Sequence, residues 1–249
     1  QRHLKKGDIV GVGVLIDSCQ KCYSCKSSLE QYCNEGAVFT YNAPDAILGG
    51  RTFGGYSETI IVNEKFVLKI PVNLDIKSVA PLLCAGITTY SPLKKWKIGK
   101  NDKVGIIGMG GLGHIAIKFA KAMEAQVTVI TSSKKKINDA KNLGASEVIL
   151  SKDNIAMQKN HNSFDFLLNT IPNSHDLNIY LSLLKIDKTM VIVGAIEPFK
   201  NVNIRNLIFG RKSISGSLIG GIKETQDMLN FCAKNNIVCD VEIIDINQI

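Results

Sequence analysis

The residues with the clearest chemical potential are four cysteines within fifteen residues, Cys19, Cys22, Cys25 and Cys33. Four thiolates on one loop can surround a zinc ion tetrahedrally, which leaves no open position for a substrate. The spacing is neither that of a zinc ribbon, whose C-x2-C pairs stand about 15–20 residues apart, nor that of a thioredoxin-like redox pair. We therefore predict a structural zinc site. Unligated reduced thiols and an iron–sulfur cluster are the alternatives.

The remaining cysteines, Cys84, Cys232 and Cys239, are isolated in the sequence. An odd total, with no apolar signal segment near the N-terminus, argues against a disulfide framework and for a reducing compartment. We therefore expect a cytoplasmic protein. The apolar stretches are too short to cross a bilayer, so no membrane partner is expected.

A glycine-rich turn is the second feature with a chemical meaning. It matches G-x-G-x-x-G, and an apolar strand precedes it, a helical pattern follows it and a second strand comes about twenty residues later. In a dinucleotide-binding turn, the first glycine permits the bend, the second lets a pyrophosphate approach, and the third lets the helix pack closely. A tight turn without a ligand is the alternative. The residues of the motif are Gly108, Met109, Gly110, Gly111, Leu112 and Gly113.

The end of the second strand decides between NAD and NADP. NAD-selective sites place Asp or Glu there to bind the ribose 2′-hydroxyl. Here Thr131 is followed by Ser132, Ser133 and three lysines that end at Lys136, with no carboxylate. Hydroxyl and ammonium groups suit a 2′-phosphate, so we predict NADP(H), with Ser132, Ser133 and Lys136 as contacts. A solvated first turn of a helix is the alternative.

The elements that must position these residues follow two different patterns. Residues 8–14, 56–62 and 66–70 read as strands among turns, and 238–244 reads as a final strand. Beyond Pro92, helical patterns separate six short apolar runs, at 103–107, 127–131, 147–150, 164–169, 189–193 and 213–217. Such alternation predicts an α/β fold with a doubly wound, six-stranded parallel (Rossmann) sheet, preceded by a β-rich domain.

The net charge of +8 raises the question of nucleic-acid binding. The basic residues are scattered apart from one run, 134–136, and only 6% of the residues are aromatic. A basic zinc-binding module for nucleic acid would also leave the glycine-rich turn and the six-strand pattern without a role. We therefore expect a solvated basic surface and no nucleic-acid partner.

Taken together, these segments resemble the medium-chain zinc alcohol dehydrogenases, most closely their cinnamyl-alcohol-dehydrogenase-like branch. The likeness runs through nearly the whole chain and keeps the order of the family's motifs. The matching segments are residues 17–33, 54–57, 80–86, 88–92, 108–113, 193–195 and 216–220.

The resemblance implies hydride transfer between NADP(H) and a primary alcohol or aldehyde, assisted by a second, catalytic zinc. It implies that Cys84 is a thiolate ligand of that zinc, although from the sequence alone Cys84 would pass as a buried apolar cysteine. It places Thr88 beside the nicotinamide. It also implies backbone contacts with the carboxamide region from Val193, Ala195 and Ser217.

The resemblance also implies a domain division: residues 1–92 form part of a GroES-like catalytic domain with the structural zinc lobe, 93–236 the NADP-binding Rossmann domain, and 237–249 the start of a return to the catalytic domain. The family's other catalytic zinc ligands lie upstream of the lobe, in a Cys-x-x-Cys-His-Ser-type segment and a Gly-His-Glu motif that these 249 residues do not contain. We therefore expect an incomplete form that is inactive alone. The histidines present are expected to be surface or helix residues: His3, His114, His161 and His175.

Two other readings of the chain stay open. A zinc-free medium-chain enone or quinone reductase would lack the four-cysteine segment, and a truncated zinc-binding fragment would have no catalytic role. The sequence does not specify which alcohol or aldehyde is the substrate. The sequence also leaves the oligomeric state open, although the resemblance offers a homodimer, because the family usually dimerises through the sheet edge of its nucleotide domain.

Overall fold

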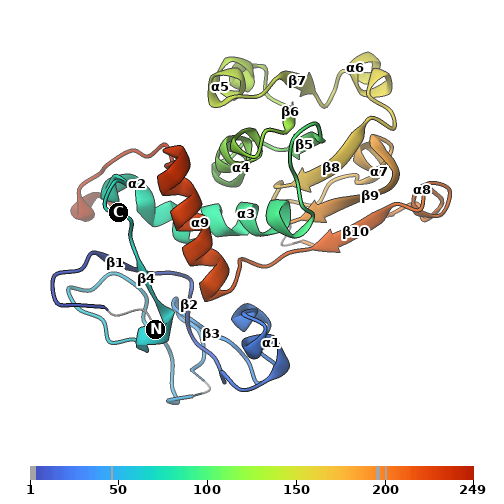
Figure 1. Ribbon diagram of the computed structural model, residues 1–249. Helices are drawn as coiled ribbons and strands as arrows, with labels where there is room; N and C mark the ends of the chain where they lie inside the picture. Colours follow the sequence, from blue (N-terminus) through green and yellow to red (C-terminus); the bar gives the residue numbers. More distant parts are fainter. Residues whose placement is uncertain (1–3, 46, 195–196, 200) are drawn as a thin grey trace. The chain divides into compact units, whose positions relative to one another are not determined.

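The computed structural model describes residues 4–45, 47–194, 197–199 and 201–249 and divides them into two compact units (Figure 1). Unit 1 comprises Gln1–Ile87 and Ile219–Ile249, and unit 2 comprises Thr88–Leu218. The first predicted boundary, at residue 92, lies close to the division at Ile87, whereas the second, at 236, lies beyond the division at Ile219. None of the helices in the described part of the chain combines the length and apolar character needed to cross a bilayer.

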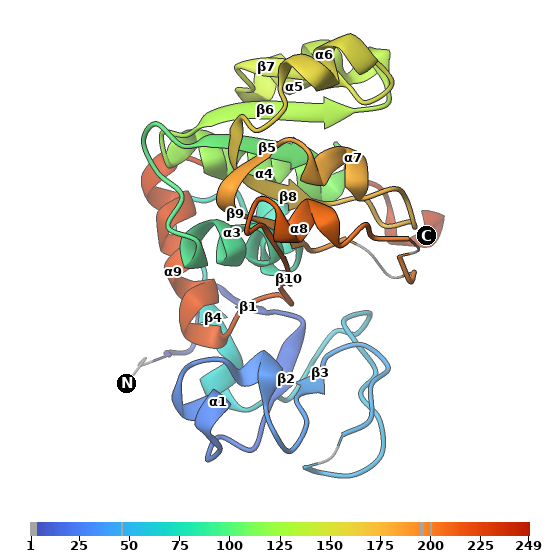
Figure 2. The same ribbon diagram turned by 90° about the vertical axis from the view of Figure 1, so that its right-hand side faces the viewer.

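Unit 2 contains a six-stranded, fully parallel sheet, which confirms the predicted fold. Figure 2 shows its strands stacked from β7 to β10. Three of the predicted strands have the observed bounds, and β9 begins earlier than predicted, at Leu184. In sheet order the strands are β7 (Glu147–Leu150), β6 (Gln126–Thr131), β5 (Lys103–Ile107), β8 (Phe164–Asn169), β9 (Leu184–Ile192) and β10 (Ser213–Gly216).

Helices cover both faces of this sheet, which explains why its strands are apolar runs rather than alternating patterns (Figure 1). The aromatic core beneath them includes Phe119 and Phe166, which are almost completely buried, and Tyr90 packs edge-on against Phe119 at 5.4 Å between ring centroids. Helix α3 begins in unit 1 and continues into unit 2. The helices are α3 (Ala85–Lys95), α4 (Gly111–Ala122), α5 (Ile137–Leu143), α6 (Asn154–Lys159), α7 (Asn178–Leu181) and α8 (Arg205–Ile208).

Unit 1 has little regular structure among its described residues. Strands β1 (Val10–Val12) and β4 (Val67–Lys69) pair antiparallel, as do β2 (Leu15–Asp17) and β3 (Val38–Phe39). The short helices are α1 (Tyr23–Lys26) and α2 (Ile76–Val79), with 3-10 turns at Glu30–Tyr32, Glu64–Phe66, Ala80–Leu83 and Ile246–Gln248.

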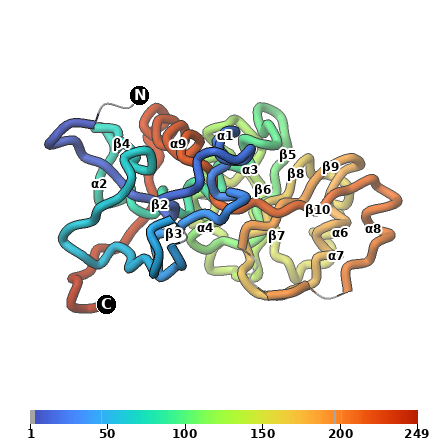
Figure 3. The backbone as a smooth tube through the Cα atoms, turned by 90° about the horizontal axis from the view of Figure 1, so that it is seen from below, coloured from blue at the N-terminus to red at the C-terminus, as the bar shows by residue number. Residues whose placement is uncertain are grey.

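The long helix of unit 1, α9 (Ile222–Asn235), lies beside β4 (Figure 3). The side chain of Gln226 accepts from the backbone N–H of Lys69 and donates to its carbonyl, both at 2.9 Å. Asn73 Nδ2 donates to the carbonyl of Ala233 at 2.9 Å. The domain division implied by the resemblance places α9 in the nucleotide domain, whereas these bonds join it to the rest of unit 1.

Two strand predictions are wrong: residues 56–62 and 238–244 do not form strands. In the first segment Ile61 is fully exposed, and in the second Val241, Ile243 and Ile244 are exposed. An alternating apolar pattern indicates a face that other side chains can bury. A strand also needs a neighbouring strand whose backbone N–H and C=O groups form hydrogen bonds with its own. Among the described strands none pairs with either segment. The predicted strand at 8–14 is reduced to β1.

Candidate functional sites

The four-cysteine cluster forms on a loop of unit 1 between β2 and β3. Its four sulfur atoms all lie within 4.8 Å of one another, and it is the single group of three or more potential metal ligands found among the described residues. The sulfur of Cys25 lies 3.5 Å from that of Cys22 and 3.9 Å from that of Cys19. Tetrahedral zinc–thiolate bonds would place neighbouring sulfurs about 3.8 Å apart. The donor set therefore fits zinc.

Backbone N–H groups aim at these sulfurs and favour the thiolate form. The N–H of Cys19 donates to Cys33 Sγ, and that of Cys22 donates to Cys19 Sγ, both at 3.4 Å. Backbone bonds from Cys25 and Asn34 lower the pKa of Cys22 to about 6. Burial raises the pKa of Cys25 to about 12, so a bound cation would have to offset the cost of its thiolate form.

The cluster loop also contacts the start of α9. Oε2 of Glu30 accepts from the backbone N–H of Ile222 at 3.1 Å. A Cβ at Gly221 would collide with the carbonyl oxygen of Ser28, so only glycine permits this approach. The first N–H groups of a helix lack partners within the helix, and a carboxylate there is stabilised by the helix dipole. The loop thus caps α9.

We expect the Cys25→Ser variant to lose zinc. Its zinc content should fall from one zinc per chain toward zero. Its unfolding midpoint should drop by roughly 5–10 °C, because each kcal/mol lost from the free energy of unfolding lowers the midpoint by about 2–4 °C in a chain of this size. Zinc content by atomic emission and thermal unfolding by circular dichroism test this. Cys84→Ser is the matched control, because Cys84 is exposed and lies outside the cluster. A second zinc per chain, or full zinc content in Cys25→Ser, would contradict the prediction.

The glycine-rich turn follows β5 and ends at the N-terminus of α4. Gly108 has φ of +90°, a conformation that favours glycine. Gly110 is the N-cap of α4, and a Cβ built there meets nothing within 4 Å. A Cβ on Gly113 would collide with the carbonyl oxygen of Gly108. The turn therefore needs glycine at 108 and 113 for its own packing, whereas at 110 the missing side chain leaves open space.

Thr170, at the carboxyl end of β8, joins this turn to its neighbours. Its hydroxyl donates to the carbonyl of Ile107 at 2.9 Å. A Cβ on Gly194, just beyond β9, would collide with the carbonyl of Thr170. Thr170 is absent from the residues predicted from the sequence, although its place directly after a buried apolar strand was a usable signal. The neighbouring Asn169 is absent too, a fully buried residue whose Nδ2 lies 2.9 Å from His175 Nε2.

Lys136 reaches the glycine-rich turn from the segment after β6, because its Nζ donates to the carbonyl of Met109 at 2.5 Å. Ser133 precedes the short 3-10 turn Lys134–Lys136, and its N–H donates to Thr131 Oγ1 at 3.3 Å. Ser132 is exposed at the same strand end. The structure thus brings Lys136 to the turn and leaves Ser132 and Ser133 at the adjacent strand end.

The remaining predicted cofactor contacts lie at the same edge of the sheet or on α3. Val193 follows β9 and donates its N–H to the carbonyl of Asn169 at 3.0 Å, and Ser217 follows β10 and donates to that of Ile192 at 3.3 Å. Thr88 is buried on α3. Gly111 and Leu112 form the first turn of α4. Ala195 lies outside the described residues.

Cys84 occupies the junction between the 3-10 turn Ala80–Leu83 and α3, in unit 1. The side chain is exposed, which corrects the expectation of a buried apolar cysteine. Partial burial of the thiol nevertheless raises its pKa. Cys84 does not belong to a group of three metal ligands among the described residues. For the expected second, catalytic zinc, the described residues therefore provide one candidate ligand, Cys84, and no complete donor set.

Two glycine substitutions separate packing from ligand access. Gly113→Ala should lower the free energy of unfolding by roughly 2 kcal/mol, because the new methyl group overpacks the turn. Gly110→Ala should keep stability within about 0.5 kcal/mol, because its methyl group meets open space. It should nevertheless weaken NADPH binding by at least about tenfold if a pyrophosphate lies against that residue.

Denaturant unfolding and fluorescence titration with NADPH measure the two effects. A stable Gly113→Ala protein would contradict the packing argument, and unchanged NADPH affinity in Gly110→Ala would contradict the pyrophosphate assignment.

Two family models match the chain. Residues 111–234 match the zinc-binding dehydrogenases, and residues 1–72 match the alcohol dehydrogenase GroES-like domain. An aldehyde reductase of Escherichia coli (strain K12) is 50% identical over 245 residues, which cover 98% of this chain and 70% of that protein.

Solved structures with the same fold include two of similar length coverage. A cinnamyl alcohol dehydrogenase from Sorghum bicolor superposes with a TM-score of 0.94 at 37% identity, over 98% of this chain and 70% of that one. A Helicobacter pylori protein described as CAD, in complex with NADP(H), gives a TM-score of 0.90 at 40% identity, over 98% and 71%.

Proposed function

The chain belongs to the medium-chain zinc alcohol dehydrogenases, in their cinnamyl-alcohol-dehydrogenase-like branch, and we propose that it serves hydride transfer between NADP(H) and a primary alcohol or aldehyde. The single observation that carries the cofactor assignment is the bond from Lys136 Nζ to the carbonyl of Met109. It brings a cation to a glycine-rich turn that has no acidic residue at the adjacent strand end. The relatives described above support the reaction: one is named an aldehyde reductase, and one was solved with NADP(H).

NADP(H) supplies the chemistry of hydride exchange when bound, and the residues of this chain orient it. The first N–H groups of α4 favour the pyrophosphate, and Gly110 leaves room for its approach. Lys136, with Ser132 and Ser133, favours the 2′-phosphate. Val193 and Ser217 directly follow neighbouring strands, and their N–H groups are bonded within the sheet. Their carbonyl oxygens are therefore the backbone groups proposed to accept from the carboxamide of the nicotinamide.

Thr88 and Cys84 are assigned by family resemblance: Thr88 beside the nicotinamide and Cys84 as a thiolate ligand of a catalytic zinc. Burial holds Cys84 toward its neutral thiol, so a metal cation would be needed to keep it ionised. The described residues around Cys84 do not complete a zinc site, so this region of the chain supplies one ligand to that metal and no more.

Location and assembly follow the same reasoning. We infer a cytoplasmic location, because four closely spaced cysteines without a disulfide favour a reducing compartment. We infer a homodimer through β10, because it is an edge strand of the six-stranded sheet and one side of its backbone is available for pairing. Residues 93–236 are proposed as the functional nucleotide domain, although α9 packs with unit 1.

The cofactor proposal predicts a selective effect of Lys136→Gln. Loss of one charge-assisted hydrogen bond, worth about 1.5–3 kcal/mol, should weaken NADPH binding by roughly tenfold or more while leaving NADH binding within about twofold. The wild-type chain should bind NADPH more tightly than NADH. Fluorescence titration with both reduced cofactors measures this. Lys135→Gln removes the same charge from an exposed neighbour and should have little effect. Tighter NADH binding by the wild type would reject the assignment.

The reaction is tested on the product of the whole open reading frame, by following NADPH absorbance as cinnamaldehyde or an aliphatic aldehyde is reduced. NADPH consumption should require the aldehyde and should fall to background in Cys84→Ser, while the zinc of the four-cysteine cluster is retained. Full activity in Cys84→Ser would contradict the role of Cys84. Consumption of NADPH with an enone but with neither aldehyde would favour the reductase alternative.

A further inference from the structure

A buried amide and an imidazole form a pair at the carboxyl edge of the six-stranded sheet, outside the cofactor contacts assigned above. Asn169, the last residue of β8, is fully buried, and His175 stands on the loop between β8 and α7. Asn169 Nδ2 lies 2.9 Å from His175 Nε2. A buried donor that loses its partner destabilises the fold, so the folded chain favours this pair.

The hydrogen-bond partners of the His175 ring determine where its proton lies. The amide nitrogen of Asn169 can only donate, so Nε2 of the ring accepts. The backbone carbonyl of Asn173 can only accept and lies 2.7 Å from Nδ1, so Nδ1 carries the proton. His175 is therefore neutral in this arrangement, and a proton added at Nε2 would face the N–H groups of the amide.

Neither member of the pair can turn to avoid such a contact. Asn169 Oδ1 accepts from the backbone N–H of Ile171 at 3.1 Å, so turning the amide over would break both of its bonds. The imidazole lies edge-on to two aromatic rings, with its centroid 5.7 Å from that of Tyr180 and 5.2 Å from that of Phe199. Protonation of His175 would therefore cost its bond to Asn169.

The titratable side chains that the described residues place beside this ring are two carboxylic acids and one phenol, while β8 contributes the uncharged amide. Asp176 follows His175 in the chain, and Glu197 Oε2 accepts from the backbone N–H of Ser174 at 2.9 Å. Burial raises the pKa of Tyr180, on α7. The two carboxylates favour a positive ring, whereas the amide opposes it. A histidine can change charge between about pH 5 and 8, so mild acid shifts this balance.

The pair is attached to a backbone that the proposed function uses. The carbonyl of Asn169 accepts from the N–H of Val193 at 3.0 Å, and the N–H of the next residue, Thr170, donates to the carbonyl of Ile107 at 2.9 Å. Asn169 and Thr170 thus join the ends of β5 and β9. Because the carbonyl of Val193 is proposed to accept from the carboxamide of the nicotinamide, a movement of Asn169 would displace that acceptor.

We propose that His175 is a positioning residue for the nicotinamide end of the cofactor, because its neutral ring fixes Asn169 and Asn169 fixes Val193. This role rests on the proposed function, since Val193 matters here as a nicotinamide contact. Cofactor binding then favours the neutral ring, and protonation of His175 opposes binding. The affinity for the nicotinamide end should therefore fall as the pH falls.

Two probes separate the nicotinamide end of the cofactor from the rest of it. NADP⁺ has the nicotinamide, whereas 2′-phospho-ADP-ribose has the same phosphates without that ring, so the ratio of the two affinities cancels the titration of the phosphates. Calorimetric titration of the zinc-loaded chain at about pH 8 and about pH 6 measures this ratio. In the wild type the preference for NADP⁺ should fall by about threefold or more at the lower pH.

Two substitutions of His175 distinguish positioning from packing. His175→Gln puts an amide oxygen in place of Nε2, which accepts but does not titrate, so NADP⁺ affinity at about pH 8 should stay within about twofold and the pH effect should disappear. His175→Ala leaves the donor of Asn169 without its partner. It should weaken NADP⁺ binding by about tenfold at both pH values, while 2′-phospho-ADP-ribose binds within about twofold of wild type.

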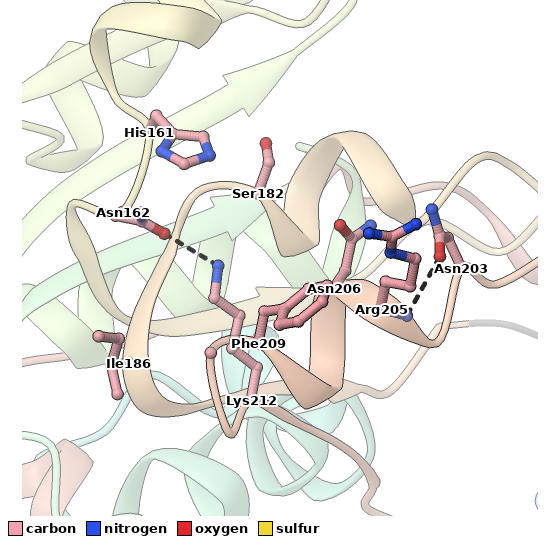
Figure 4. Close-up of a pocket in the computed structure, with 10 residues that line it drawn as sticks. His161, Asn162, Ser182, Ile186, Asn203, Arg205, Asn206, Phe209 and Lys212 are labelled. Carbon is pink, nitrogen blue, oxygen red and sulfur yellow. Dashed lines mark hydrogen bonds between the residues drawn. The ribbon is translucent and has the colours of Figure 1, made fainter.

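His161→Gln is the matched control. His161 is exposed just before β8, so it lies at the amino edge of the sheet, opposite the cofactor turn. Figure 4 shows it on the lining of a pocket there, where none of the bonds drawn reaches its ring. This variant should keep the wild-type affinities and the wild-type pH effect, and a thermal melt verifies that every variant is folded.

Nitrogen NMR of the histidine rings tests the pair without a cofactor. At about pH 8 the ring signal that is lost in His175→Gln should be that of an imidazole protonated on Nδ1. An Nε2-protonated ring, a wild-type pH effect in His175→Gln, or equal weakening of both probes in His175→Ala would each overturn the role of His175 alone. Absence of NADP⁺ binding by the wild type would refute the proposed function together with this role.

Discussion

The packing around Thr170 is the constraint on which the carboxyl edge of the sheet depends. Its hydroxyl bonds the carbonyl that ends β5, and the same oxygen lies 2.9 Å from where a Cβ on Gly108 would be. Its own carbonyl lies against Gly194, so the turns after β5, β8 and β9 meet at one threonine. Two backbones can approach this closely only where one lacks a side chain. Gly108 and Gly194 are therefore needed for packing at the carboxyl edge of the sheet, independently of any ligand.

The two units are stabilised by different kinds of interaction. Unit 2 buries aromatic and aliphatic side chains between a sheet and its helices, with Phe119, Phe166 and Ile106 almost inaccessible. The cluster loop of unit 1 has short elements and exposes Tyr23 and Tyr32. A metal held by four thiolates can replace an apolar core where a loop has too few side chains to build one.

Features with a local cause were predictable from the sequence, and features with a distant cause were not. The cysteine spacing and the G-x-G-x-x-G turn place their residues within one loop each, so the sequence located both. The apolar runs of the parallel sheet were also visible, because both faces of the sheet are covered. By contrast, the bond between Glu30 and Ile222 joins residues 192 positions apart and has no sequence signal. The strand predictions at 56–62 and 238–244 failed for a related reason, since pairing depends on a partner that the segment itself does not encode.

The composition of unit 1 from two separate stretches has a consequence for how the chain folds during synthesis. All of unit 2 is contiguous, so its residues are available together, and domains generally fold as units as they emerge from the ribosome. The thiols of Cys19 to Cys33 emerge earlier still and need nothing beyond their own loop to capture a metal. Unit 1, however, cannot complete its packing until α9 has been translated. The stretch Gln1–Ile87 can therefore close its metal loop early, but it cannot finish packing until the distant helix α9 has been translated.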